Sequence, residues 1–220
     1  MEDLGKLLGL PRKLAAGANI THEGQADNSA CVLLQGWVAA SKTLANGKSQ
    51  IIDFRVPGDL LPAGGDARGI SGVDLTLLTD VVICEFQAPI GVVLRQNSPH
   101  VAAALLDALS RDAAIIVEHL VNVGRRDPQE RTAHLLLELG VRLRRVGLGA
   151  EARFKCPLTQ VLLADALGLS GIHLNRVLRQ LRELGFVRVH GNLVEIDDVE
   201  KLAEFAGFDR QYLEWDRCAH

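Results

Sequence analysis

The chain has 220 residues, of which 48% are hydrophobic and 23% charged, and its formal net charge is −3. This length favours two modest domains, since one core usually covers about 100 to 150 residues, and the composition excludes a disordered chain. No apolar run is as long as a membrane span, which needs about 18 residues, and the segment that starts at Met1 lacks the pattern of an export signal. We therefore expect a cytoplasmic protein without a membrane partner.

Short apolar or alternating runs follow one another from about Leu14 to Phe86. The turn signals between them are Gly17, Glu23-Gly24, Gln35-Gly36, Asn46-Gly47 and Pro57-Gly58-Asp59. Short strands at this spacing predict an antiparallel β-roll of jelly-roll type. Asn46-Gly47 also predicts a hairpin, because both residues tolerate the positive φ that a tight turn demands.

A long helix is predicted from Ser98, as N-cap, and Pro99 to Gly124. Its apolar residues recur at alternating spacings of three and four, as in an a/d seam: Ala102, Leu106, Leu109, Ala113, Ile116, Leu120 and Val123. Such a stripe can pack on the β-roll or pair with its twin in a parallel homodimer. We favour the homodimer.

The next predicted helix runs from Pro128 to about Arg145, and Gly147-Leu148-Gly149 after it is typical of a linker or turn. A helix that opens at Pro157 and ends near Leu167, the turn Gly168-Leu169-Ser170, and a helix from Gly171 to about Leu184 form the helix-turn-helix layout. Residues 185–196 then indicate two brief strands around a His-Gly-Asn turn, which is a wing. We expect the acidic segment 197–215 to cap this domain.

The predicted fold is therefore α+β, with a β-roll over residues 1–97, a dimerisation helix over 98–124 and a winged helix-turn-helix with a helical tail over 125–220. The region from Arg153 to His190 is locally positive in spite of the negative total, because its six arginines and lysines face only Asp165 and Glu183. The cysteines Cys31, Cys84, Cys156 and Cys218 form no C-x-x-C pair, and we expect no metal site. No nucleophile, base and orienting group stand at a recognisable spacing, so we expect no enzyme.

The ordered glycine turns from Gly17 to Asp59 resemble the cyclic-nucleotide-binding β-roll of Crp/Fnr regulators. Residues 127–139 resemble the helix after the dimer helix of that family, and residues 158–185 resemble its DNA-binding segment. The likeness extends from about Leu14 to Ile196. It implies a transcription regulator whose partners are double-stranded DNA, a second copy of the chain and RNA polymerase.

The resemblance aligns Arg176 with the arginine that the family uses for a guanine, and a guanidinium fork does meet guanine O6 and N7 together. The same first half of the helix carries Gly171, Ile172, His173 and Asn175, of which Asn175 and His173 are expected beside Arg176 as base readers. Ile172 stands where the family often has a glutamate that accepts from cytosine, so the half-site should differ. The expected phosphate contacts are Thr159, Gln160, Ser170, Arg179 and His190. Arg176 as a merely solvated residue and His190 as an ordinary turn residue are the alternatives.

The β-roll departs from the family where cyclic-AMP receptors hold the ribose and phosphate. The chain has Asp59-Leu60-Leu61-Pro62-Ala63 in place of the ribose-binding Gly-Glu, and it has no arginine beside Ser71-Gly72. Burying a phosphate without a guanidinium is costly, so we expect no cyclic-AMP dependence unless Arg68 substitutes.

An iron–sulfur sensor is not expected either, because that branch of the family needs a cysteine cluster near the N-terminus, whereas the first cysteine here, Cys31, lies inside a predicted strand. We expect no cofactor, and the sequence does not identify the effector. The alternative is a ligand- or haem-responsive sensor with His22, His100 or His119 as iron ligand.

Overall fold

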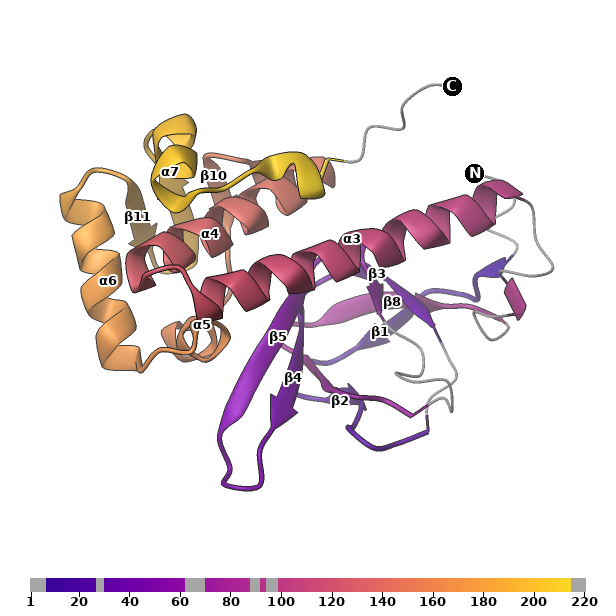
Figure 1. Cartoon of the computed structure of the whole chain (residues 1–220). Helices are drawn as coiled ribbons and strands as arrows, with labels where there is room; N and C mark the ends of the chain where they lie inside the picture. The colour runs from indigo at the N-terminus through magenta and orange to yellow at the C-terminus, as the bar shows by residue number, and fades with distance from the viewer. Residues whose placement is uncertain (1–6, 27–29, 62–69, 88–91, 94–98, 215–220) are drawn as a thin grey trace. The chain divides into compact units, whose positions relative to one another are not determined.

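The structure is a computed structural model that describes residues 7–26, 30–61, 70–87, 92–93 and 99–214 (Figure 1). The predictions for Pro62-Ala63, Arg68, Ser98 and Cys218 lie outside these residues. The chain divides into two compact units, residues 1–112 and 113–220. The division falls inside helix α3 (Pro99–Gly124), which belongs to both units.

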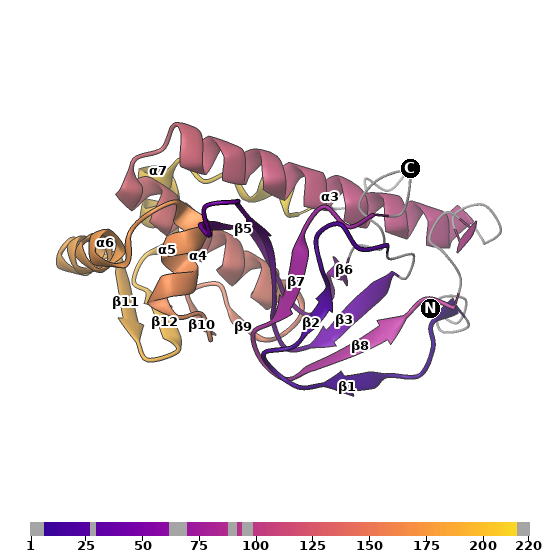
Figure 2. The same cartoon turned by 90° about the horizontal axis from the view of Figure 1, so that it is seen from below.

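Two four-stranded antiparallel sheets form the first unit. One has the order β1 (Arg12–Leu14), β8 (Val81–Glu85), β3 (Cys31–Gln35) and β6 (Leu60–Leu61), and the other has β2 (Asn19–Thr21), β7 (Asp74–Leu77), β4 (Val38–Thr43) and β5 (Ser49–Arg55). Alternate residues of both sheets meet in one buried cluster, which contains Cys31, Leu33, Val38, Ala40, Leu61, Leu75, Leu77, Val81 and Ile83. The predicted antiparallel β-roll is thus confirmed, and Figure 2 shows its strands from below.

The β4–β5 hairpin forms at Asn46-Gly47 as predicted, but its turn differs from the expected one. Only Gly47 has a positive φ, of 79°, and no residue other than glycine has one in the described residues. The connection spans residues 44–48, and the Asn46 side chain accepts a hydrogen bond from the Lys48 amide at 3.1 Å. The longer loop removes the need for a positive φ at Asn46.

The first part of α3 packs on the roll through residues outside the predicted seam. Val101 and Leu105 are buried in a cluster with Ala30, Leu60, Phe86 and Val93. Arg55 of β5 also lies 2.7 Å from the Asp112 carboxylate on α3. One side of the helix is therefore occupied by the roll, and the predicted seam lies on another.

The second unit is built around α4 (Pro128–Arg145), whose bounds are those predicted. The Asp127 carboxylate accepts from the Gln129 and Glu130 amides, while the Glu130 carboxylate accepts from the Asp127 amide. This capping box fixes the first residue of the helix. Residues 132–143 of α4 are all buried, so α4 is the central element of this unit.

The second unit contains a third four-stranded sheet with the order β11 (Val187–His190), β12 (Leu193–Ile196), β10 (Arg153–Lys155) and β9 (Gly149–Ala150) (Figure 2). The two wing strands β11 and β12 were expected, whereas β9 and β10 were not, and Gly149 belongs to a strand rather than to a linker. Two and three residues are too few to show a strand pattern. Helix α7 (Val199–Ala206) and the 3-10 turn η1 (Arg210–Tyr212) complete the unit.

No single helix in the described part of the chain has the length and hydropathy needed to cross a membrane. Only the two helices over 160–183, taken together as a bent pair, pass by length and composition.

Candidate nucleic-acid interface

Two short helices joined by a tight turn form the core of the candidate interface. Helix α5 (Gln160–Leu167) begins after Thr159, whose hydroxyl accepts from the Leu162 amide at 3.3 Å, and ends at Gly168 with φ 61°. Helix α6 (Gly171–Glu183) begins after Ser170, whose hydroxyl accepts from the His173 amide at 3.2 Å. The two helices are bent by 96° relative to each other, within the about 90–120° range of helix-turn-helix units.

Helix α6 has one buried and one exposed side. Leu174, Val177 and Leu181 are buried, which fixes the rotation of the helix about its axis. The residues left exposed on the other side include Ile172, Asn175, Arg176, Arg179 and Arg182. This rotation turns a polar, basic face outward from the second unit.

A groove of about 780 Å³ runs along this face of α6 and reaches the wing. Its lining comprises Leu158, Thr159, Gln160, Leu163, Ile172, Asn175, Arg176, Leu178, Arg179, Arg182, Val189 and Gly191. The groove contains three arginines and no carboxylate, so its charge suits a polyanion.

Six of the ten predicted DNA-binding residues line this groove: Thr159, Gln160, Ile172, Asn175, Arg176 and Arg179. The other four, Ser170, Gly171, His173 and His190, are not among the lining residues. The Asn175 amide donates one N–H to the Gly171 carbonyl at 3.1 Å, which leaves its second N–H and its Oδ1 for the N7 and N6 groups of an adenine.

Sequence reasoning missed Arg182, which lines the groove three residues beyond Arg179. The signal was present, because positions 172, 175, 176, 179 and 182 fall on one helical face. Conversely, the positive segment counted in the sequence includes two arginines of the β9–β12 sheet that are already paired. Arg153 lies 3.3 Å from Glu195, and Arg188 is paired with Asp197.

The predicted seam of α3 is open along its length. Leu106, Leu109, Ala113, Ile116, Leu120 and Val123 are exposed, and Ala102 is half-buried. Leu120, at 69% exposure, is the most exposed of the leucine, isoleucine and valine residues among them. A row of exposed leucine, isoleucine and valine on one helix is costly in water and is the pattern that a second helix covers.

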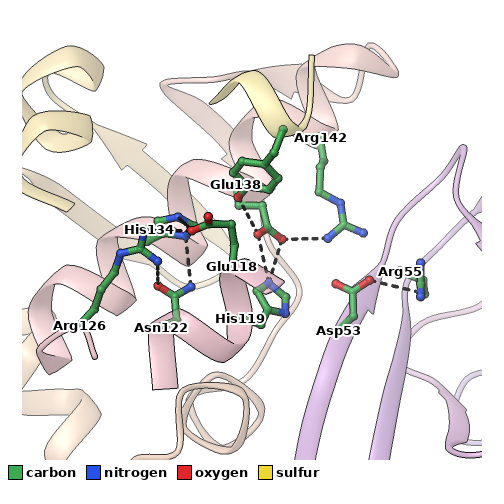
Figure 3. Close-up of polar contacts among 10 residues, drawn as sticks. Asp53, Arg55, Glu118, His119, Asn122, Arg126, His134, Glu138 and Arg142 are labelled. Carbon is green, nitrogen blue, oxygen red and sulfur yellow. Dashed lines mark hydrogen bonds and ion pairs between the residues drawn. The ribbon is translucent and has the colours of Figure 1, made fainter. Parts of the chain in front are cut away.

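A buried polar network joins the second part of α3 to α4 and η1 (Figure 3). The fully buried Glu138 carboxylate is 3.1 Å from His119 Nε2, and it accepts from Arg142 Nη1 at 3.0 Å and from the Tyr212 hydroxyl at 2.9 Å. Burial raises the pKa of Glu138, but the charge and hydrogen bond of His119 and the charge of Arg142 outweigh it and lower the pKa to about 2. Glu138 is therefore an anion that its three donors hold in place.

His134 belongs to the same network and lies one turn before Glu138 on α4. Arg126 Nη1 donates to Asn122 Oδ1 at 2.8 Å, so the Asn122 amide nitrogen faces His134 Nδ1 at 3.1 Å and donates to it (Figure 3). His134 Nε2 lies 3.2 Å from a Glu118 carboxylate oxygen. Burial, aided by Arg126 and opposed by Glu138 and Glu118, lowers the pKa of His134 to about 4. The imidazole is thus neutral near pH 7.

We expect this histidine to make the second unit sensitive to mild acid. The pKa of His134 is about 6.5 in the unfolded chain and about 4 in the folded chain, so the unfolded chain binds more protons between these two pH values. The free energy of unfolding therefore decreases as the pH falls from 6.5 to 4. Between pH 7 and pH 5 the loss from this group is about 2 kcal/mol. Glu138 contributes little there, because its stabilising effect is lost only between its unfolded pKa of 4.5 and its folded pKa of about 2.

Urea unfolding at pH 7 and pH 5 measures this loss. His134→Gln should lose about 2 kcal/mol less than the wild type over the interval, since it does not titrate. His173→Gln, which removes an exposed histidine of α6, should lose as much as the wild type. Equal losses in the wild type and His134→Gln would contradict the assignment.

The sensor residues named from the sequence have other partners in the structure. The Ser71 hydroxyl donates to the Val73 carbonyl at 2.7 Å, and Leu60 is part of a buried cluster. Two of the alternative haem ligands have neighbours within their own unit: His22 Nδ1 lies 3.1 Å from the Asn19 amide nitrogen, and His119 is held by Glu138. His100 is exposed on α3, about 28 Å along the helix from His119.

Two family models match the chain, one in each unit. A cyclic nucleotide-binding domain matches residues 11–89, and a Crp-like helix-turn-helix domain matches residues 130–205. The first covers the β-roll strands and the second covers α5, α6 and the wing.

Curated relatives and solved structures are similar to the chain over most of its length. The transcriptional activator protein FnrL of Cereibacter sphaeroides is 26% identical over 90% of this chain and 81% of its own. The nitrogen fixation regulation protein FixK of Bradyrhizobium diazoefficiens is 29% identical over 89% of this chain and 83% of its own. The structure of FixK2 from Bradyrhizobium japonicum has a TM-score of 0.76 and 21% identity, and it covers 89% of this chain and 96% of that one. The chain therefore shares its fold with FixK2 over 89% of its length.

Proposed function

The chain belongs to the Crp/Fnr family of transcription regulators, and from this premise we propose that it acts as a homodimer on a two-fold symmetric DNA site. The observation that carries the proposal is the groove of α6, where the exposed arginines Arg176, Arg179 and Arg182 gather. Within residues 99–214, no carboxylate forms an ion pair with Arg176 or Arg182, so both guanidinium groups are available to DNA. The exposed seam of α3 supports the homodimer.

Within this proposal, the parts of the chain have separate roles. Residues 1–97 form a sensor, residues 98–124 form the dimerisation helix, and residues 125–220 form the DNA-binding domain. Arg176 reads a guanine, with Asn175 and His173 beside it. Thr159, Gln160, Ser170, Arg179 and His190 contact phosphates. FnrL is named a transcriptional activator, and on that likeness we infer RNA polymerase as a further partner.

We also propose that DNA binding does not require cyclic AMP. The Ser71 hydroxyl is committed to the Val73 carbonyl, and buried leucines form β6 directly after Asp59. Neither feature offers a charged partner to a phosphate, and a buried phosphate needs one. The effector of the β-roll is therefore expected to be a different chemical signal.

Selection of bound sequences from random duplex DNA, with and without cyclic AMP, tests both statements. We expect enrichment of a two-fold symmetric sequence whose half-sites lie about one DNA turn, or 34 Å, apart, equally in both conditions. Failure to enrich any sequence would refute sequence-specific DNA binding. Enrichment of a single half-site would refute the symmetric dimer, and enrichment only with cyclic AMP would refute nucleotide independence.

A further inference from the structure

Ile172 is an apolar side chain at the first turn of an otherwise basic helix face. It is 79% exposed, more than any of the exposed leucine, isoleucine and valine residues of α3. Single exposed apolar residues are common on protein surfaces, so exposure alone carries no function. Its place is informative, because Ile172 lines the same groove as Arg176 and Arg179.

Ile172 and Arg176 are one helical turn apart and therefore on the same side of α6. The separation along the helix axis is about 6 Å. Successive base pairs are about 3.4 Å apart. Side chains at these two positions thus reach bases that are one or two steps apart in the major groove.

The chemistry of the major groove limits what an isoleucine can read there. Three of the four bases present only hydrogen-bonding groups on that edge, whereas thymine adds a C5-methyl group. The Ile172 side chain has neither donor nor acceptor, and any base that offers only polar groups to it would lose its water without compensation. The methyl group of thymine is the one apolar partner on the unmodified base edges.

The Asn175 side chain, on the same face of α6, is partly engaged with the helix backbone. Asn175 Nδ2 donates to the Gly171 carbonyl at 3.1 Å, which holds this side chain against the first turn of the helix. The hydroxyl of Ser170 accepts from the His173 amide as the helix cap. Asn175 and Ser170 thus each use one hydrogen-bonding group on the backbone of this turn, whereas Ile172 presents only apolar groups to the groove.

We propose that Ile172 is a specificity-determining residue that contacts the C5-methyl group of a thymine in each half-site, within one or two base pairs of the guanine read by Arg176. The inference rests on the proposed function, since it requires α6 to enter the major groove. The positive face formed by Arg176, Arg179 and Arg182 supplies the charge complementarity for that approach.

Replacement of thymine by deoxyuridine tests this contact, because it removes the methyl group and leaves the pairing and the O4 acceptor unchanged. Each thymine of the selected site is replaced in turn, and affinity is measured by fluorescence anisotropy. At one position of each half-site, we expect binding to weaken about 4-fold, or about 15-fold when both half-sites are changed, as for one methyl group removed from apolar contact. At the same position 5-methylcytosine should bind about 4-fold better per half-site than cytosine.

Two variants assign the effect to its residue. Ile172→Ala should remove the difference between thymine and deoxyuridine at that position and keep the guanine preference of Arg176. Val161→Ala is the matched control, because Val161 is also apolar and 64% exposed but does not line the groove. It should keep the full difference.

The outcomes separate the inference from the function on which it rests. If the wild type selects no sequence, the proposed function fails. If it selects a site but every thymine tolerates deoxyuridine, the function stands and the Ile172 contact is refuted. A methyl effect that persists in Ile172→Ala would also refute it, since another residue would then read the methyl group.

Discussion

Leu109→Glu combined with Ile116→Glu is expected to give a monomer that binds the full DNA site about 10²- to 10⁴-fold more weakly than the wild type. Both residues lie on the exposed seam of α3, with 42% and 45% exposure. In a parallel pair, each glutamate would face apolar residues of the partner helix. Burying a carboxylate there without a cation is prohibitive, so the helices separate.

The loss of DNA affinity follows from the loss of linkage between two half-site contacts. In the dimer, binding of one half-site brings the second to a high local concentration, whereas a monomer binds one half-site alone. Light scattering gives the mass, and anisotropy titration gives the affinity. The control is Ala104→Glu with Leu44→Glu, which adds the same two charges at exposed residues outside the seam and should remain dimeric.

An unchanged dimer mass in the seam variant would show that α3 does not form the interface. A monomer that keeps the full affinity would instead show that the two half-sites are read independently. We expect the seam variant to remain folded, because the substituted side chains are exposed in the single chain. Circular dichroism at the pH of the titration checks this.

The elements that sequence predicted well have a strong local signal. The bounds of α4 follow from Asp127, Pro128 and Glu130, which form a capping box within four residues. The turn before α6 follows similarly from Gly168 and Ser170. In each case, the groups that end or begin the helix belong to neighbouring residues, so tertiary structure is not needed to infer them.

What sequence did not predict depends on contacts between distant residues. Glu138 lies within an apolar run, where its spacing predicts nothing, yet it is the acceptor for His119, Arg142 and Tyr212. The donor furthest in sequence, Tyr212, is 74 residues away. Similarly, β10 pairs along one edge with β12, which is distant in sequence.

The candidate interface shows the same division between local and distant information. The resemblance to the family named Arg176 and Arg179 as DNA contacts, and the groove contains both. The pairing of Arg188 with Asp197 depends on the fold of the wing, and the sequence alone counted Arg188 as free charge. Charge totals along a segment therefore overstate the cations that are available to DNA.

Arg176→Ala is expected to weaken binding to the preferred site by about 1–3 kcal/mol per half-site, or about 2–6 kcal/mol for the dimer, and to relax discrimination at one base pair. The reason is that the guanidinium group can donate to guanine O6 and N7 together, which no other base pair offers in that geometry. Arg176 is exposed in the groove. Among residues 99–214, no ion pair of Arg176 has to break before its donors reach the base.

Arg179→Ala should behave differently, because we assign Arg179 to phosphate. Its Nε lies 3.7 Å from the Glu183 carboxylate, one turn further along α6. Loss of a phosphate contact weakens binding to all sequences alike and lowers the slope of log affinity against log salt by about 0.9 per contact. Sequence preference is unchanged. Lys201→Ala, which removes one positive charge from α7 outside the groove, is the charge-matched control and should change neither property.

The measurement is the affinity of the three variants for the selected site and for every single-base substitution of it, at several salt concentrations. The two roles make different predictions for these affinities. Arg176→Ala should remove the base preference at one position of the site, whereas Arg179→Ala should lower the affinity for every sequence by the same factor. If Arg176→Ala keeps the full base preference while Arg179→Ala loses it, the reader and the phosphate contact are interchanged. If both variants lower the affinity for every sequence by the same factor, neither arginine reads a base. Discrimination between bases must then come from the remaining groove residues, of which Ile172 and Asn175 face the same side of the helix.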